Sequence, residues 1–257
     1  MTSVKNTAAL DMFFRSFLDF EGSQTIDSAM NGIQVDNDGS EIKKIVFAVD
    51  VCLESIKRCI AAKGNMLFVH HGLFWGEALP LKGPHRERLR FLLENNISLY
   101  AVHLPLDQDP KLGNNAALVE LLGIENPQPF GLYKGKKIGY KGALKKPLTI
   151  QQAANAISYM DRPPLGLFPF GKEINETCAV ISGGAAREAV QALEEGMDLY
   201  VTGESGHLNY HFALEGCLNI VAGGHYSTEV WGVRKVMAEC AAVLNIDTEF
   251  IDIPTGL

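Results

Sequence analysis

Two periodicities of apolar and polar positions run along the chain and predict an ordered succession of helices and strands. Residues 5–20 place Leu10, Phe13, Phe14 and Phe17 at helical spacing, which predicts an opening amphipathic helix. Short apolar runs bounded by turn residues predict buried strands. We expect strands within 30–36, 43–51, 65–72, 97–107, 176–184, 197–204, 217–229 and 247–254. We expect further helices within 52–64, 85–96, 114–123, 149–160, 185–196, 207–216 and 230–244.

The succession strand, helix, strand, helix, strand occurs twice, in residues 43–107 and again from residue 176 onward. Strands that alternate with helices indicate an α/β protein whose sheets are mainly parallel and covered by helices. We therefore expect two related α/β halves with mainly parallel or mixed sheets. The expected domains are residues 1–124 plus 225–257, and residues 125–224.

The connecting segments carry their own signals. Residues 125–148 are dense in Pro, Gly and Lys and predict a connector with one or two strands, and residues 161–171 predict a proline-rich loop. For the helix within 114–123, we expect Asn114 to be the N-cap and Gly123 to follow its last turn.

Polar clusters follow the apolar strands at the points where these strands end. The clusters are HHG from His70, HLPLD from His103, TGE up to Glu204, and GGHYSTE up to Glu229. In open α/β sheets, ligands gather beyond the carboxyl ends of the strands. A residue past the last ladder hydrogen bond no longer alternates between faces, so the adjacent His70 and His71 are expected to turn toward one crevice.

Imidazole and carboxylate groups at these strand ends predict a metal site between the halves. The candidate ligands are His70, His71, His103, Asp107, His225 and Glu229. Such donors suit Zn, Fe, Mn, Ni or Co. One tetrahedral ion is filled by about four donors. Six candidates with two carboxylates therefore favour a pair of ions, with Asp107 or Glu229 bridging them.

Two spacings bear on how these side chains face one another. His225 and Glu229 stand four residues apart and share a helix face if a helix begins near His225. His103 and Asp107 have the same spacing, but Pro105 argues against a regular helix there, so a turn is expected to orient them.

Several other residues allow two interpretations each. Glu204 either faces the same crevice or serves a helix N-terminus. Phe74 and Trp75 either line a base-stacking pocket or belong to the core or an interface. Asn31, in a turn with Gly32, is a candidate substrate-binding residue, as are Phe74 and Trp75. His85, His207 and His211 are interpreted as structural. The pairs Gly183-Gly184 and Gly223-Gly224 look like phosphate-binding turns, but they match neither phosphate-binding motif and are weak signals.

Composition narrows the class of protein. The chain has 257 residues, 47% of them hydrophobic and 21% charged, which is typical of a soluble globular protein. No apolar run reaches the length of about 20 residues that a membrane helix needs. Five scattered cysteines outside any C-x-x-C motif favour a reducing, cytoplasmic location. The net charge of −7 argues against a nucleic-acid partner, and the short basic stretch 133–146 is interpreted as a solvated hairpin.

The combined motifs resemble those of the Nif-three-like dinuclear metal-centre family of YbgI type, whose bacterial members are often labelled GTP cyclohydrolase I type two homologues. The matching segments are NGIQVD, VHHGLFW, HLPLDQDPKLGNN, VTGE, AGGHYSTEVWGVR and IDIP. They run in order from residue 31 to residue 254 and so cover nearly the whole chain.

The resemblance implies a function and a set of ligands. It implies two divalent ions held by His70, His71, Asp107, His225 and Glu229, with His103 orienting a ligand or relaying a proton rather than binding an ion. It implies a homo-oligomeric ring, a trimer or a hexamer. The expected function is a metal-dependent hydrolase acting on a nucleotide-like small molecule, with His103 or Glu204 moving protons. The alternative is a non-catalytic protein that handles metal or serves as a ring-shaped scaffold.

Overall fold

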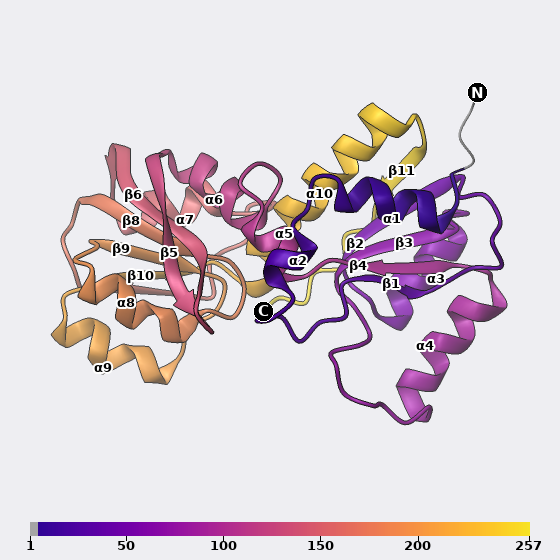
Figure 1. Ribbon diagram of the computed structural model, residues 1–257. Helices are drawn as coiled ribbons and strands as arrows, with labels where there is room; N and C mark the ends of the chain where they lie inside the picture. The colour runs from indigo at the N-terminus through magenta and orange to yellow at the C-terminus, as the bar shows by residue number, and fades with distance from the viewer. Residues whose placement is uncertain (1–4) are drawn as a thin grey trace. The chain divides into compact units, whose positions relative to one another are not determined.

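The computed structural model describes residues 5–257, which form two compact units (Figure 1). The first unit comprises the described residues up to Leu106 together with Val233–Ile253, and the second comprises Asp107–Gly232 and Pro254–Leu257. These units are groups of residues that lie close in space. The domain boundaries expected from the sequence stay a prediction.

The first unit is built on a five-stranded sheet with the order β1-β4-β3-β2-β11. Its strands are β1 (Gly32–Val35), β2 (Lys44–Asp50), β3 (Met66–His71), β4 (Ser98–Ala101) and β11 (Asp247–Phe250). The neighbouring pairs from β4 to β11 are parallel, and β1 is an antiparallel edge strand. The helices are α1 (Thr7–Arg15), α2 (Phe20–Ser23), α3 (Leu53–Ala61), α4 (Gly83–Glu94), and the part of α10 (His225–Leu244) from Val233 onward.

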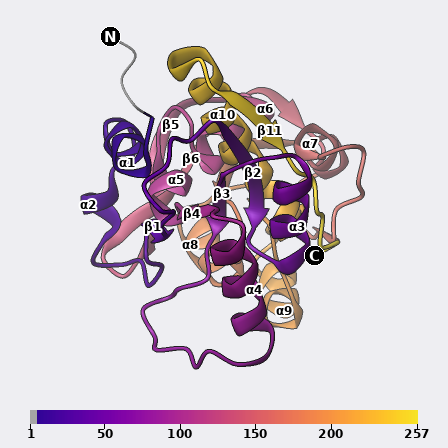
Figure 2. The ribbon, with the colours of Figure 1, turned by 90° about the vertical axis from the view of Figure 1, so that its right-hand side faces the viewer.

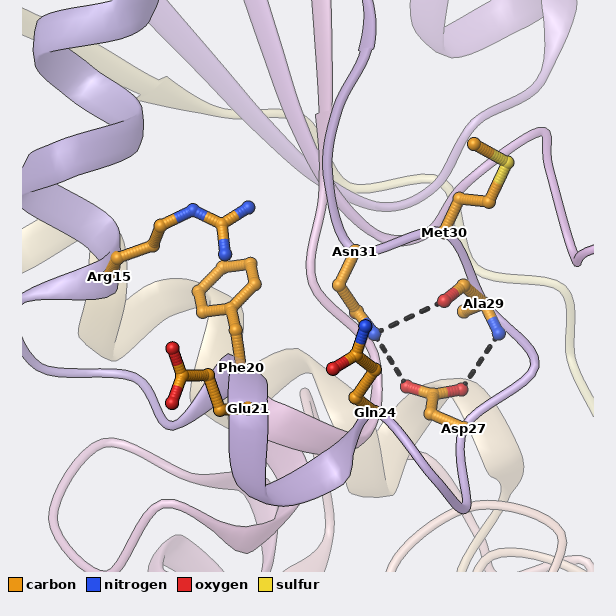
Figure 3. A pocket seen from close by; sticks show the side chains of 8 residues that line it. All are labelled: Arg15, Phe20, Glu21, Gln24, Asp27, Ala29, Met30 and Asn31. Carbon is orange, nitrogen blue, oxygen red and sulfur yellow. Dashed lines mark hydrogen bonds between the residues drawn. The ribbon is translucent and has the colours of Figure 1, made fainter.

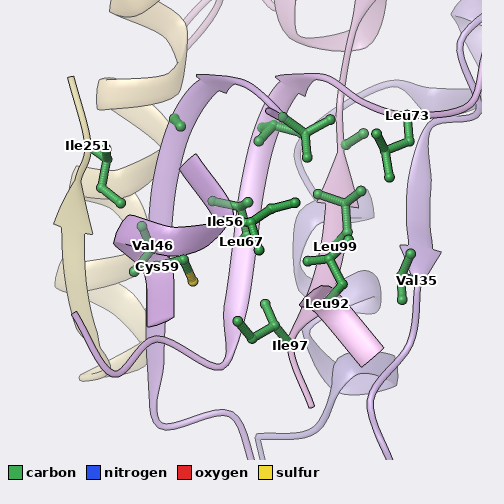
Figure 4. Packing of buried hydrophobic residues seen from close by; sticks show 14 residues of the cluster. Val35, Val46, Ile56, Cys59, Leu67, Leu73, Leu92, Ile97, Leu99 and Ile251 are labelled. Atoms are coloured by element: carbon green, nitrogen blue, oxygen red, sulfur yellow. The ribbon is translucent and has the colours of Figure 1, made fainter. Parts of the chain in front are cut away.

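One face of this sheet packs against α3 and α4 (Figures 2 and 4). Side chains of the two helices pack against those strand residues that point to this face. The helices contribute Ile56 and Cys59 of α3 and Leu92 of α4, and the strands contribute Leu67 and Leu99 among others. The other face holds aromatic rings, with Phe68 stacked 5.8 Å from Tyr100 and Phe14 of α1 against both. Both faces are therefore buried, which explains why β2, β3 and β4 are continuous apolar runs.

The second unit contains a six-stranded mixed sheet with the order β5-β6-β8-β9-β10-β7. Its strands are β5 (Ile124–Tyr133), β6 (Lys136–Leu148), β7 (Gly166–Pro169), β8 (Asn175–Ile181), β9 (Leu199–Thr202) and β10 (Asn219–Ala222). The pairs β8-β9 and β9-β10 are parallel, whereas β5, β6 and β7 are antiparallel to their neighbours. The helices are α5 (Leu104–Gln108, from Asp107 onward), α6 (Asn114–Leu122), α7 (Ile150–Ile157), the short η1 (Ala186–Glu188), α8 (Ala189–Glu194), α9 (His207–Glu215) and the start of α10.

Helices cover both faces of the second sheet as well (Figure 1). Leu118 of α6 and Ile157 of α7 pack against Val180 and Val201 on one face, while α8 and α9 lie on the other. The expected α/β fold with two mixed, helix-covered sheets is thus confirmed. Each unit also contains the repeated succession strand, helix, strand, helix, strand, with the three strands adjacent and parallel.

Four local expectations differ from the structure. The expected helix over 5–20 is shorter, because α1 ends at Arg15, and a separate short helix, α2, begins at Phe20. The loop expected at 161–171 contains β7. This strand tolerates Pro169 because it lies at the edge of the sheet and Pro169 is its last residue. The N-cap of α6 is Gly113, whereas Gly123 adopts the left-handed conformation expected of it, with φ of 68°. A short helix, α5, does form around Pro105. Pro105 lies in the first turn, where backbone N–H groups make no hydrogen bond within the helix, so the missing N–H of proline costs nothing.

The buried face beneath α3 gives a first prediction. Leu67 is fully buried in the middle of β3, so Leu67→Ala removes apolar contacts and leaves a cavity. We expect a loss of about 2–5 kcal/mol in the unfolding free energy of the first unit, measured by urea denaturation. Leu93→Ala on the exposed side of α4 is the matched control, since Leu93 is 64% exposed and its loss leaves no cavity. Equal effects of the two changes would contradict the packing described.

Candidate metal centre

Strand β3 ends in the two adjacent histidines, each held by a different neighbouring strand. His70 is fully buried, and its Nδ1 lies 2.8 Å from the carbonyl oxygen of Val102, directly beyond β4. His71 pairs with Asp50 across β2, and its Nδ1 lies 2.8 Å from Oδ1 of that carboxylate. Both histidines still belong to the strand rather than lying past its end. Their ring centroids are 4.6 Å apart.

His103 follows β4 and is fixed by a buried carboxylate. Its Nδ1 lies 2.8 Å from Oδ1 of Asp27, whose side chain is only 1% exposed. Its backbone N–H donates to Oδ1 of Asn31 at 2.7 Å. Asp27 also accepts hydrogen bonds from the Asn31 amide and from the backbone N–H of Ala29 (Figure 3). It accepts another from the backbone N–H of Leu104. The loop from Asp27 to Asn31 therefore determines where the His103 ring lies.

The three imidazoles form one cluster in the first unit. His103 lies 5.1 Å from His70 and 5.6 Å from His71, measured between ring centroids. Each ring offers one nitrogen, and these three nitrogens lie within 4.8 Å of one another. Among residues 5–257, His225 belongs to another possible metal-binding group, with His71 and Glu229, whereas His85, His207 and His211 join no such group. The short distances between the rings and between their nitrogens are both expected of a metal-binding cluster.

Phe74 and Trp75, which follow the two histidines, lie in different surroundings. The Trp75 ring lies 4.9 Å from His103 and 6.0 Å from His71, and its Nε1 donates to the carbonyl oxygen of Gly72. Phe74 packs against the core cluster beneath α3 and α4. Asn31 uses its side chain to hold His103 and Asp27. Trp75 is therefore the member of this set that flanks the imidazole cluster.

Asp107 is the first residue of the second unit and is held by buried amides. Its Oδ1 accepts from Nδ2 of Asn114 at 2.9 Å and from the hydroxyl of Ser182 at 3.0 Å. Asn115 donates to the backbone carbonyl of Asp107 and accepts from the backbone N–H of Ser182. The carboxylate is only 6% exposed. Its direction is thus set by α6 and by the end of β8.

Helix α10 begins at His225, so His225 and Glu229 do share one face of it, as their spacing predicts. Nε2 of His225 lies 3.1 Å from Oε2 of Glu229, and its Nδ1 is paired with Glu204 beyond β9. Burial acts to lower the pKa of His225, but the hydrogen bonds and charges of Glu229 and Glu204 raise it to about 9. A metal ion bound at His225 must therefore displace a proton.

A glycine makes this carboxylate–imidazole contact possible. Gly183 has φ of 64°, and a Cβ at this position would collide with Oε1 of Glu229 and stand 3.2 Å from Nε2 of His225. Its N–H donates to the hydroxyl of Thr228 at 3.0 Å, one turn into α10. Gly183 therefore has a structural role next to the side chains of Glu229 and His225.

The sequence pattern missed several residues that hold the site. They are Asp27, Asp50, Asn115 and Ser182. Asp50 ends an apolar strand, so the strand-end argument that selected His71 applies to it equally. Asp27, Asn115 and Ser182 carry no comparable signal, because their partners are distant in the sequence.

Comparisons with known proteins agree over the full length. The family model for Duf34/NIF3 (NGG1p interacting factor 3) matches residues 6–255. A GTP cyclohydrolase 1 type 2 homolog of Treponema pallidum is 38% identical, covering 96% of this chain and 98% of the relative. The protein of the same description from Archaeoglobus fulgidus is 38% identical over 98% and 100% of the two chains.

Solved structures show the same fold. Protein ybgI superposes with a TM-score of 0.88 at 33% identity, covering 98% of this chain and 100% of that one. TTHA1606 from Thermus thermophilus gives a TM-score of 0.86 at 31% identity, over 98% and 100% of the chains. Reduced HcgD from Methanocaldococcus jannaschii gives 0.83 at 29% identity, over 96% and 98%. On the match of its whole length to the family model and to these relatives, the chain belongs to the Duf34/NIF3 family.

Proposed function

We propose that this protein is a dinuclear metal-dependent hydrolase that acts on a nucleotide-like substrate. The observation that carries the proposal is the set of anchored imidazoles and buried carboxylates at strand and helix ends. His70 and His71 come from the first unit, and Asp107, His225 and Glu229 from the second. The substrate class follows from the name GTP cyclohydrolase 1 type 2 homolog that the relatives carry.

The residues fit a pair of divalent transition-metal ions. Imidazole nitrogens and carboxylate oxygens suit Zn, Fe, Mn, Ni or Co, and two carboxylates allow bridging. His70 and His71 each have Nδ1 next to an oxygen acceptor, the arrangement usual for metal-bound histidine. Asp107 and Glu229 are nearly inaccessible to water, and a buried carboxylate is stabilised by a bound cation.

The remaining residues have roles in binding and proton movement. Ions held by these residues would supply Lewis acidity for polarising a substrate oxygen and for lowering the pKa of water. His103 and Glu204 are placed to hold or move protons, His103 on the Asp27 carboxylate and Glu204 on His225. Trp75 offers a ring beside His71 and His103 on which a nucleobase can stack.

The decisive experiment compares metal-loaded wild type with Asp107→Ala on a panel of nucleotides, phosphoesters and cyclic amides. We expect the variant to lose metal and to hydrolyse its substrate about 10²–10⁴ times more slowly, since both ions and the groups they orient are affected. Asp247→Ala is the matched control, because Asp247 is an exposed aspartate at the start of β11. Elemental analysis of each protein accompanies the assay. A fully loaded wild type that hydrolyses nothing above Asp107→Ala would favour metal handling or a scaffold instead.

Two further expectations stay predictions. They are the assembly into a ring-shaped trimer or hexamer and the cytoplasmic location. Within residues 5–257, no helix combines the length and the apolar character needed to cross a membrane.

A further inference from the structure

We propose that a cavity in the first unit is a second small-molecule site, which binds a free α-amino acid with an apolar side chain. The cavity lies between the end of α1, the helix α2 and the loop from Asp27 to Asn31 (Figure 3). Its volume of about 470 Å³ is within the range of about 300–1,000 Å³ that small-molecule sites occupy. The proposal is independent of hydrolysis and of bound metal, since none of the candidate metal ligands lines the cavity.

Arg15 presents a preorganised guanidinium group to the cavity. Its Nε donates to Oδ2 of Asp11 at 2.8 Å, and Asp11 in turn accepts a hydrogen bond from the hydroxyl of Tyr100, a core residue. The guanidinium carbon lies 4.3 Å from the centre of the Phe20 ring. Gly32, with φ of 108°, leaves room for the guanidinium, because a Cβ there would stand 2.9 Å from Nη2. Within residues 5–257, no second side chain forms a hydrogen bond or salt bridge with Arg15, so Nη1 and Nη2 are available to a ligand.

The cavity offers partners for both charged groups of an amino acid. Two parallel N–H groups of a guanidinium match the two oxygens of a carboxylate. The carboxylate of Glu21 also lines the cavity, and in the described part of the chain it takes part in no hydrogen bond or salt bridge, so it can accept from an ammonium group. Figure 3 shows the charged ends of Arg15 and Glu21 beside the ring of Phe20. One positive and one negative group are thus presented together.

The distribution of charge favours such a zwitterion over an anion. The charge of Arg15 is already paired with that of Asp11. Asp27 also lines the cavity, and its oxygens are occupied by four hydrogen bonds within the protein. A phosphate dianion in this cavity would face the negative charges of Glu21 and Asp27, which repel it. An α-amino acid carries one charge of each sign and has no net charge to be repelled.

The remaining walls fit an apolar side chain on the ligand. Phe20, Ala29 and Met30 line the cavity together with the amide of Gln24. Met30 is 54% exposed, so an apolar group that packs against it removes apolar surface from water. The side chains of leucine and methionine provide such a group and carry no further charge. These two amino acids are therefore the expected ligands.

The test measures binding of L-leucine and L-methionine to the metal-free full chain by isothermal titration calorimetry. We expect saturable binding of one molecule per chain, and we expect Arg15→Gln and Glu21→Gln each to weaken it by about 10–100-fold, since each removes one charged hydrogen-bonding partner. Arg58→Gln is the matched control. Arg58 is also exposed and also pairs through Nε with a carboxylate four residues earlier, Glu54, at 2.7 Å, but it does not line the cavity. This control variant should bind the ligand like the wild type.

Ligand analogues give a second readout that does not depend on any variant. N-acetyl-L-leucine has no ammonium group and L-leucinamide has no carboxylate, so each should bind the wild type about 10–100-fold more weakly than L-leucine. Circular dichroism should show that all variants are folded. No binding of either amino acid to the folded wild type at about 10 mM, equal affinity for L-leucine and both analogues, or stronger binding of inorganic phosphate would each overturn the proposal. None of these measurements involves metal or hydrolysis, so their failure is separate from a failure of the proposed function.

Discussion

Gly183→Ala is expected to disrupt metal binding by Glu229 and His225 while leaving the first unit folded. The new Cβ collides with Oε1 of Glu229, a group only 3% exposed, so the carboxylate or the start of α10 must shift. The left-handed backbone adds about 1–2 kcal/mol of strain for any residue with a Cβ. Overpacking of a buried site adds about 1–3 kcal/mol. Thermal unfolding and the number of ions bound per chain measure the two effects.

Gly196→Ala separates strain from collision. Gly196 has φ of 69°, close to that of Gly183, but no atom lies within 4 Å of the position that its Cβ would take. This control variant is expected to lose only the stability that corresponds to the strain of the left-handed backbone, and to bind metal like the wild type. If Gly183→Ala also keeps its full metal content, the close approach of Gly183 to Glu229 has no role in the site.

Asp27→Ala is expected to destabilise the first unit strongly. It removes the acceptor of four donors: the ring of His103, the side-chain amide of Asn31, and the backbone N–H groups of Ala29 and Leu104. Each buried donor left without a partner costs about 1–3 kcal/mol, so the loss of stability should be about 3 kcal/mol or more. Urea denaturation measures this loss in the free energy of unfolding.

Two controls make this prediction specific. Asp50→Ala removes a carboxylate from His71, but the Asp50 side chain is 33% exposed, so water can replace it and the cost should be about 1 kcal/mol. Asp27→Asn keeps the shape and removes the charge. Equal losses for Asp27→Ala and Asp50→Ala would show that the Asp27 network contributes nothing beyond one ordinary hydrogen bond.

The pH dependence of the Asp27→Asn comparison follows from the carboxyl group's pKa. Burial acts to raise the pKa of Asp27, but the hydrogen bond and charge of His103, with Asn31 and Ala29, lower it below the usual value. A lowered folded-state pKa gives stability that is present above the unfolded value of about 3.9 and is lost as pH falls through the folded one. The advantage of the wild type over Asp27→Asn should therefore shrink below about pH 4.

The sequence predicted those parts of the fold and site that depend on local order. The apolar runs of β2 and β3 and the spacing of His225 and Glu229 are local signals, and each is found in the structure. The role of Asn114 was not predictable, because its side chain bridges Asp107 and the backbone N–H of Gly232, 118 residues away. The same holds for Gly183, whose small size matters only once α10 lies against it.

The anchoring of the three imidazoles has a consequence for the entropy of ion capture. In zinc fingers the ligands are ordered by the metal, so binding and folding are one event. Here the rings of His70, His71 and His103 are already oriented by Val102, Asp50 and Asp27, groups fixed by the sheet and the Asp27–Asn31 loop. The ordering of these side chains is thus completed during folding, so at the proposed metal centre the free energy of ion binding is expected to appear as affinity.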